Sequence, residues 1–66
     1  MTAQELEVLA ADVTDLAAVL HVLYRAGDDD DTRRTLRMAA RRAEEIAAKL
    51  EGEAVRAYER LAEVGA

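Results

Sequence analysis

The densest group of ionisable side chains in this 66-residue chain is an acidic run, Asp28, Asp29, Asp30 and Asp31. Carboxylates bind calcium when a curved loop, usually with alternating acids and a central glycine, brings several of them onto one ion. Here the acids are consecutive and Gly27 precedes them. Such a run is more typical of a helix start, where aspartates cap free backbone N–H groups and favour the helix dipole. We therefore predict a turn with a helix cap, and these four aspartates are the only metal candidates.

Five arginines follow the acidic run: Arg33, Arg34, Arg37, Arg41 and Arg42. A basic helical face of this kind can bind nucleic-acid phosphates. However, no aromatic residue lies among the arginines for base stacking, and the net charge of the chain is −5. Acid-first pairs four residues apart, such as Asp29–Arg33 and Asp30–Arg34, are the expected use of this charge. Nucleic acid is therefore not the expected partner.

His21 is the only histidine. A general base or haem ligand would need a cavity and oriented partners, and only two copies in a dimer could supply bis-histidine ligation. We expect His21 to be a half-exposed surface residue, and a ligand or cofactor site near it is an alternative. Because the chain has no Ser and no Cys, acyl-transfer chemistry lacks its usual nucleophiles. We therefore expect that the chain is not an enzyme and that it binds no cofactor.

The elements that would position these groups are helical, because nearly every residue outside one turn is a strong helix former. A chain this short buries only about 60% of its unfolded surface. Without cysteine it has no disulfide, so self-association is the remaining means of stabilisation. The longest uncharged apolar run, residues 16–24, is far shorter than a membrane span. No export signal is evident, and a cytoplasmic location is expected.

The chain, residues 1–66, is predicted to be a single helical-hairpin domain, and start and stop signals mark its two helices. Thr2 and Glu5 have the spacing of a capping box, which predicts a first helix over about 3–26. Gly27 is expected to end it in a left-handed conformation. A turn over 27–31 and a second helix over about 32–64 follow. Gly52 is expected to kink this helix, and a separate third helix is the alternative.

Apolar residues recur along both helices at alternating spacings of three and four, the pattern of a coiled-coil seam. In an antiparallel hairpin, facing residue numbers have a constant sum, here 59, as for Leu9 with Leu50 and Leu23 with Leu36. The predicted intrachain core comprises Leu6, Leu9, Val13, Leu16, Leu20, Leu23, Leu36, Ala39, Ala43, Ile46 and Leu50.

Two flanks accompany this seam. On one side, the alanines Ala10, Ala17, Ala40 and Ala47 permit close approach of the helices. The other side carries acids in the first helix and bases in the second: Glu5, Asp12, Arg42, Lys49 and Arg56. The charge of the first helix is therefore expected to be answered by the second.

A second apolar stripe remains, and the second helix overhangs the first beyond about residue 57. One hairpin cannot bury two faces of both helices, so we predict an all-α antiparallel hairpin that forms a homodimeric four-helix bundle. Asp15, inside the stripe, would then need a partner such as an arginine. The predicted self-association interface comprises Val8, Ala11, Asp15, Ala18, Val19, Val22, Gly52, Val55, Tyr58, Leu61 and Val64.

The stretch RRAEEIAAKLEGEAVRAYERLAE resembles the idealised style of de novo designed helices, and a GC-rich bacterial gene is the other origin considered. The length, the one-turn plan and the opening MTAQE resemble hairpin dimers of the ROP type, which implies a helical dimer with an RNA-binding face. No functional residue is carried over. We expect a non-enzymatic, self-associating structural or protein-interaction module. The alternatives are a bacterial regulatory or adaptor protein that binds a protein or RNA, and a designed bundle with a ligand site near His21.

Overall fold

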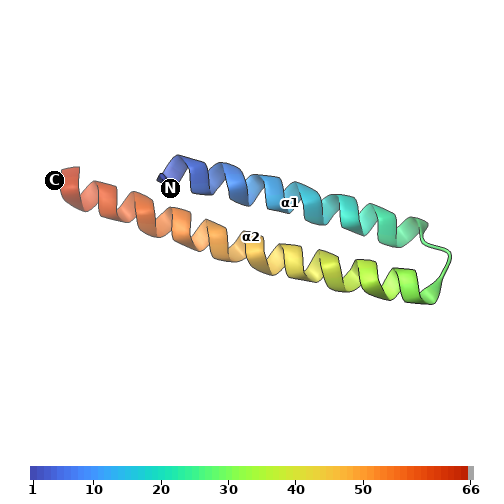
Figure 1. Ribbon diagram of the computed structural model, residues 1–66. Coiled ribbons are helices and arrows are strands. Elements are labelled where there is room, and N and C mark those ends of the chain that lie inside the picture. Colours follow the sequence, from blue (N-terminus) through green and yellow to red (C-terminus); the bar gives the residue numbers. More distant parts are fainter. Residues whose placement is uncertain (66) are drawn as a thin grey trace.

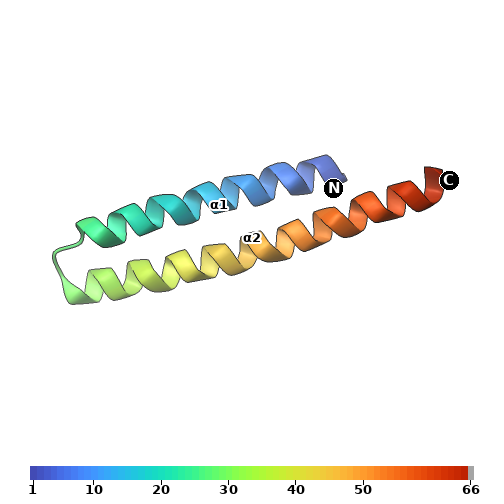
Figure 2. The same ribbon diagram turned by 180° about the vertical axis from the view of Figure 1, so that it is seen from behind.

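The computed structural model describes residues 1–65 as two antiparallel α-helices joined by a short turn (Figure 1). Helix α1 spans Ala3–Ala26, and helix α2 spans Asp30–Gly65. The molecule is a rod of 55 × 14 × 13 Å. From behind, α2 again extends past the start of α1, so the end of α2 overhangs its neighbour (Figure 2).

The start of α1 is fixed by a capping box between Thr2 and Glu5. The backbone N–H of Glu5 donates to Thr2 Oγ1 at 3.1 Å, and the backbone N–H of Thr2 donates to Glu5 Oε1 at 3.1 Å. Both bonds satisfy N–H groups that lie before the first intrahelical acceptor. The hydrogen bond from the Thr2 backbone lowers the pKa of the Glu5 carboxyl, because it stabilises the charged form.

Gly27 ends α1, but not in the left-handed conformation expected from the sequence. Its φ of −68° and ψ of 135° are extended, and its N–H donates to the Tyr24 carbonyl at 3.3 Å. The need for glycine is one of space. A Cβ atom at this position would lie 2.8 Å from Cγ of Arg33, so a larger residue would displace that side chain.

Asp29 caps α2, as the acidic run predicted. Its Oδ2 accepts from the backbone N–H of Thr32 at 3.1 Å and from the Thr32 hydroxyl at 2.8 Å. The hydroxyl bond and then the backbone bond lower the pKa of Asp29. Helix α2 begins at Asp30, slightly before the expected start, and continues through Gly52. No third helix forms in residues 1–65.

The closest contact between the helices is an alanine seam. All residues that are almost fully buried are alanines: Ala3, Ala10, Ala17, Ala40, Ala43, Ala47 and Ala54. Three of them on α1, and three on α2, repeat every seven residues, which is the period of a line along a coiled-coil helix. Alanine has no atoms beyond Cβ to hold the backbones apart. The flank that sequence analysis assigned to close approach is therefore the centre of the contact.

Four members of the predicted intrachain core are exposed instead. Leu9, Leu16, Leu23 and Ile46 have exposed fractions of 37%, 52%, 48% and 36%. The physical reason is the alanine seam: when small residues meet, each helix is rotated so that the neighbouring row of large residues turns aside. Ala43 is buried as predicted. The other predicted core residues are half-buried: Leu6, Val13, Leu20, Leu36, Ala39 and Leu50.

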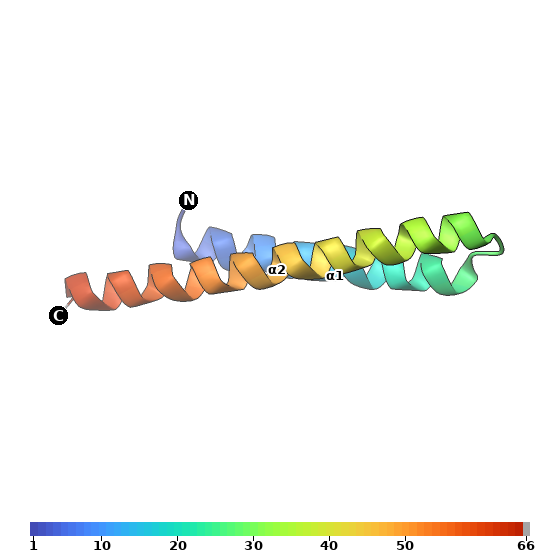
Figure 3. The ribbon, with the colours of Figure 1, turned by 90° about the horizontal axis from the view of Figure 1, so that it is seen from below.

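The hairpin is a single layer. In the view from below, the two helices cross one behind the other along most of the length of α1 (Figure 3). No further element of residues 1–65 lies over them. Both broad sides of the helix pair are consequently open.

Candidate self-association surface

One broad side of the hairpin is joined across the helices by polar contacts. The Tyr58 hydroxyl donates to Glu7 Oε2 at 2.7 Å, and the His21 ring N–H donates to Glu44 Oε1 at 2.5 Å. Glu7 and His21 are two heptads apart, as are Glu44 and Tyr58, so each pair of residues shares one line along its helix. We call this side the polar face. The hydrogen bond to Glu7 raises the pKa of Tyr58, because it favours the neutral phenol.

The opposite side is apolar. Heptad spacing places the line of Leu9, Leu16 and Leu23 next to the seam on α1, away from the contact line of His21. The corresponding line on α2 holds Ala39 and Ile46 and ends at Glu53, which pairs with Arg56. We call this side the leucine face and define it by these residues: Leu9, Leu16, Leu23, Ala39 and Ile46.

The two edges of the leucine face carry opposite charges. The next line outward on α1 contains Glu5 and Asp12, and we call it the acidic edge. The next line outward on α2 is the basic edge and contains three cations: Arg42, Lys49 and Arg56. Two of these cations form ion pairs within α2, Arg42 with Glu45 at 3.3 Å and Arg56 with Glu53. Within residues 1–65, no ion pair joins the acidic edge to the basic edge.

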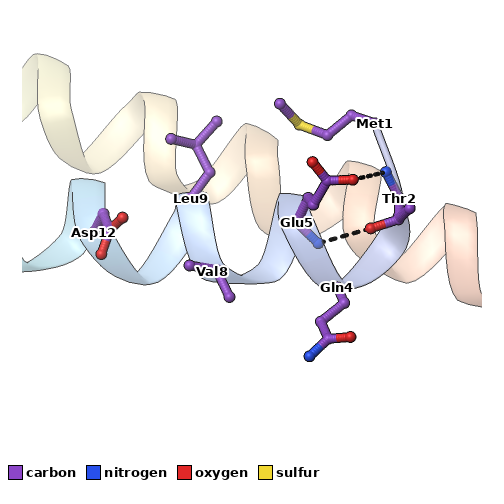
Figure 4. A pocket seen from close by; sticks show the side chains of 7 residues that line it. All are labelled: Met1, Thr2, Gln4, Glu5, Val8, Leu9 and Asp12. Carbon is purple, nitrogen blue, oxygen red and sulfur yellow. Dashed lines mark hydrogen bonds between the residues drawn. The ribbon is translucent and has the colours of Figure 1, made fainter.

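A shallow hollow marks the N-terminal end of the leucine face. Its lining includes Met1, Glu5, Val8, Leu9 and Asp12 (Figure 4). Figure 4 shows Leu9 and Val8 on opposite sides of the α1 ribbon, with Leu9 on the side of α2. Every lining residue belongs to α1 or to the two residues before it, so the hollow is an open part of the surface.

The self-association interface predicted from the sequence does not form one surface. Val8, Asp15 and Val22 share the line on α1 that is farthest from α2, whereas Gly52 lies on the corresponding back of α2. These two backs point in opposite directions, so one partner cannot cover both. Val8 and Val22 are 55% and 63% exposed. The expected partner of Asp15 is not found among the ion pairs of residues 1–65.

The other predicted interface residues are also divided. Ala11, Ala18 and Val55 border the polar face, where Tyr58 makes its contact, and Val19 continues the line of the acidic edge. Leu61 and Val64 belong to the end of α2, and both are exposed. The predicted set therefore spans several surfaces of the hairpin and stays a prediction, whereas the leucine face presents its exposed leucines on one side.

The arginine cluster is organised by an aromatic residue from the other helix. The Arg33 guanidinium lies over the Tyr24 ring, 5.0 Å from its centroid. Arg34 and Arg37 line a shallow polar hollow with Tyr24 and Asp30. The expected ion pairs of Asp29 with Arg33 and of Asp30 with Arg34 are not formed in the described part of the chain. Asp29 instead accepts from Thr32.

The candidate cofactor and metal residues are not assembled into a site. His21 contacts Glu44 on an exposed surface. Among residues 1–65, no group of three or more His, Asp and Glu side chains could hold a metal ion. Sequence reasoning missed the contacts of Glu7 with Tyr58 and of His21 with Glu44, which link positions 51 and 23 residues apart. Their shared spacing of two heptads is the signal that could have found them.

Comparison of the chain with known protein families, with curated proteins and with solved structures gave no match. Neither helix in residues 1–65 combines the length and the apolar character needed to cross a membrane.

Proposed function

We propose that this chain is a non-enzymatic, self-associating helical hairpin, and that two copies form a four-helix bundle through their leucine faces. One observation carries the proposal. The residues that a single chain almost fully buries are all alanines, while Leu16 and Leu23 remain about half exposed. Large apolar side chains provide most of the hydrophobic stabilisation in a core. A single copy therefore leaves much of the surface of these large apolar side chains in water.

The total surface of the chain supports a missing partner. Its accessible surface is 5094 Å², whereas a compact monomer of this mass would expose about 4,100 Å². The Cα radius of gyration is 15.6 Å, against about 11 Å for a compact domain of this length. Both differences arise because a two-helix rod has no side on which a closed core could form.

The size of the leucine face suits a stable dimer. Helix α1 has 24 residues, which gives a length of about 36 Å, and two adjacent helices are roughly 20 Å wide. Covering such a face buries about 700 Å² on each copy, or about 1,400 Å² in total, which lies in the range of stable protein interfaces. The core of the bundle would contain the residues that the heptad pattern first assigned to the single hairpin.

What the dimer does depends on whether the chain is designed or natural. In a designed chain, assembly would itself be the function. In a natural adaptor, the dimer would leave the polar face and the cluster of Arg33, Arg34 and Arg37 free for a further partner. Both cases require the leucine face to be covered by a second copy.

Sedimentation equilibrium and circular dichroism at micromolar concentration test the proposal. We expect a helical dimer for the natural sequence and a loss of dimer for Leu16→Glu, because that change buries a charge in the apolar interface. Val22→Glu is the matched control, since it adds the same charge to the back of the same helix and should leave the dimer intact. A helical monomer of the natural sequence, or loss of the dimer in Val22→Glu alone, would contradict the proposal.

A further inference from the structure

The leucine face has different charges along its two edges. Glu5 and Asp12 lie along α1, and Arg42, Lys49 and Arg56 lie along α2. Within the hairpin the two edges are separated by the width of the face, and no ion pair connects them in residues 1–65. The sequence thus places opposite charges where a single copy does not bring them together.

A second copy can cover this face with twofold symmetry in two orientations. If the axis runs along the helices, both turns lie at the same end and α1 of each copy lies beside α2 of the other. If the axis runs across the helices, the turns lie at opposite ends and α1 lies beside α1. The first orientation places each acidic edge against a basic edge, whereas the second places like charges together, which is unfavourable.

The heights of the charged residues favour the first orientation. Glu5 with Arg56, and Asp12 with Lys49, have residue numbers that sum to 61, so both pairs fit one antiparallel register. The cross-helix contacts within the hairpin, Glu7 with Tyr58 and His21 with Glu44, sum to 65. A difference of four residues is about 6 Å along the axis, a displacement that a long lysine or arginine side chain can span. An axis along the helices preserves height, so the same levels face each other between copies.

We infer that two copies dock with both turns at the same end, so that the acidic edge of each α1 meets the basic edge of the partner's α2. This inference rests on the proposed dimer through the leucine face. The leucine face is covered by the leucine face of a second copy of this chain, and the two charged edges orient the copies. The opposite orientation would place the basic edges of the two copies against each other, which is unfavourable.

Spin labels at the turn distinguish the orientations. The chain has no cysteine, so Asp28→Cys creates a single labelling site in the exposed turn. Dipolar coupling should report labels within about 25 Å of each other, because packed helices lie about 10 Å apart and each label adds its own arm. A distance of about 36 Å or more, the length of α1, would overturn the orientation but keep the dimer. No intermolecular coupling at a concentration well above the expected dissociation constant would overturn the dimer itself.

Charge reversal tests the edges independently. Asp12→Lys and Lys49→Glu should each weaken the homodimer on the order of tenfold, because two contacts become repulsive. Mixing the two variants should restore affinity, since their heterodimer has opposite charges at both contacts. Asp15→Lys, which makes the same charge change on the back of α1, is the control and should leave affinity unchanged. Equal weakening by Asp12→Lys and Asp15→Lys, or no recovery on mixing, would overturn the edge contact.

Discussion

The polar face and the leucine face of this hairpin differ in whether one chain completes them. Across the polar face, the hydroxyl of Tyr58 reaches Glu7 and the ring of His21 reaches Glu44. Across the leucine face, Leu16 and Leu23 are about half exposed, and the cations at its edge pair only within α2. The same two helices therefore present one side with closed contacts and one side with open apolar groups. Rotation about the alanine seam produces this asymmetry.

The largest effect should come from the seam that both faces share. Ala47→Leu places a large side chain where the helices are closest, and overpacking of this kind costs about 1 to 3 kcal/mol. Chemical denaturation followed by circular dichroism measures the loss. Ala48→Leu is the matched control, because the neighbouring alanine is exposed. Equal stability of the two variants would mean that the seam is not the close contact.

A smaller effect should separate the two faces. Leu16→Ala removes apolar surface that the dimer would bury, and it should lower the free energy of dimer unfolding by about 1 kcal/mol per copy. The melting temperature should also fall, because a weaker dimer contributes less to the stability of the folded state at a given protein concentration. His21→Ala changes the polar face and should leave the monomer–dimer equilibrium unchanged. Loss of dimer in His21→Ala would place the interface on the wrong side.

Acid should destabilise the capped N-termini of both helices without changing the difference between the two faces. The pKa values of Glu5 and Asp29 are lowered by hydrogen bonds at the two caps. A lowered carboxyl pKa gives stability that is present above the ordinary values of 4.5 and 3.8 and is lost as pH falls through the lowered values. Thermal melts between pH 7 and pH 2 should show this loss. Asp29→Asn keeps a capping side chain without a charge and should show a smaller loss, whereas an unchanged pH profile would contradict the role of Asp29.

The smallest effect is expected on the polar face at alkaline pH. The raised pKa of Tyr58 gives stability that is present below the ordinary value of 10.0 and is lost as pH rises through the raised value. Ultraviolet titration should therefore show Tyr58 ionising later than an exposed tyrosine. Tyr58→Phe leaves Tyr24 as the only tyrosine and should remove the late component. If the late component persisted in Tyr58→Phe, the contact with Glu7 would not be its cause.

Local signals predicted the fold well because they act over a few residues. The capping box of Thr2 and Glu5 and the cap at Asp29 depend on neighbouring side chains, and the structure contains both. The rotation of the seam was not predictable in the same way. Each helix carries adjacent lines of apolar residues, and the heptad pattern alone does not choose which lines meet. Ala10 lies in the helix contact and Leu9 beside it, because a small residue permits a closer approach of the helices. That approach depends on the residues of both helices together.

Contacts between distant positions were the other part that the sequence did not reveal. The stacking of Arg33 on Tyr24 depends on the path of the turn, and that path depends on the room that Gly27 leaves for the Arg33 side chain. A left-handed glycine was the expectation, but the residue serves close packing in an extended conformation. Charge pairs four residues apart, such as Asp29 with Arg33, were overestimated because both side chains found better partners.

The alanine seam also has a consequence for the order of events in assembly. Alanine has no side-chain rotamers to lose, so closing the seam costs almost no side-chain entropy. The hairpin also joins segments that are close in sequence through one short turn, and such local topologies fold quickly. Each hairpin should therefore fold, and align the leucines of its leucine face, before it meets a second copy. Much of the ordering cost of the dimer is met before the two copies touch, which makes the hairpin a preorganised half of its own bundle.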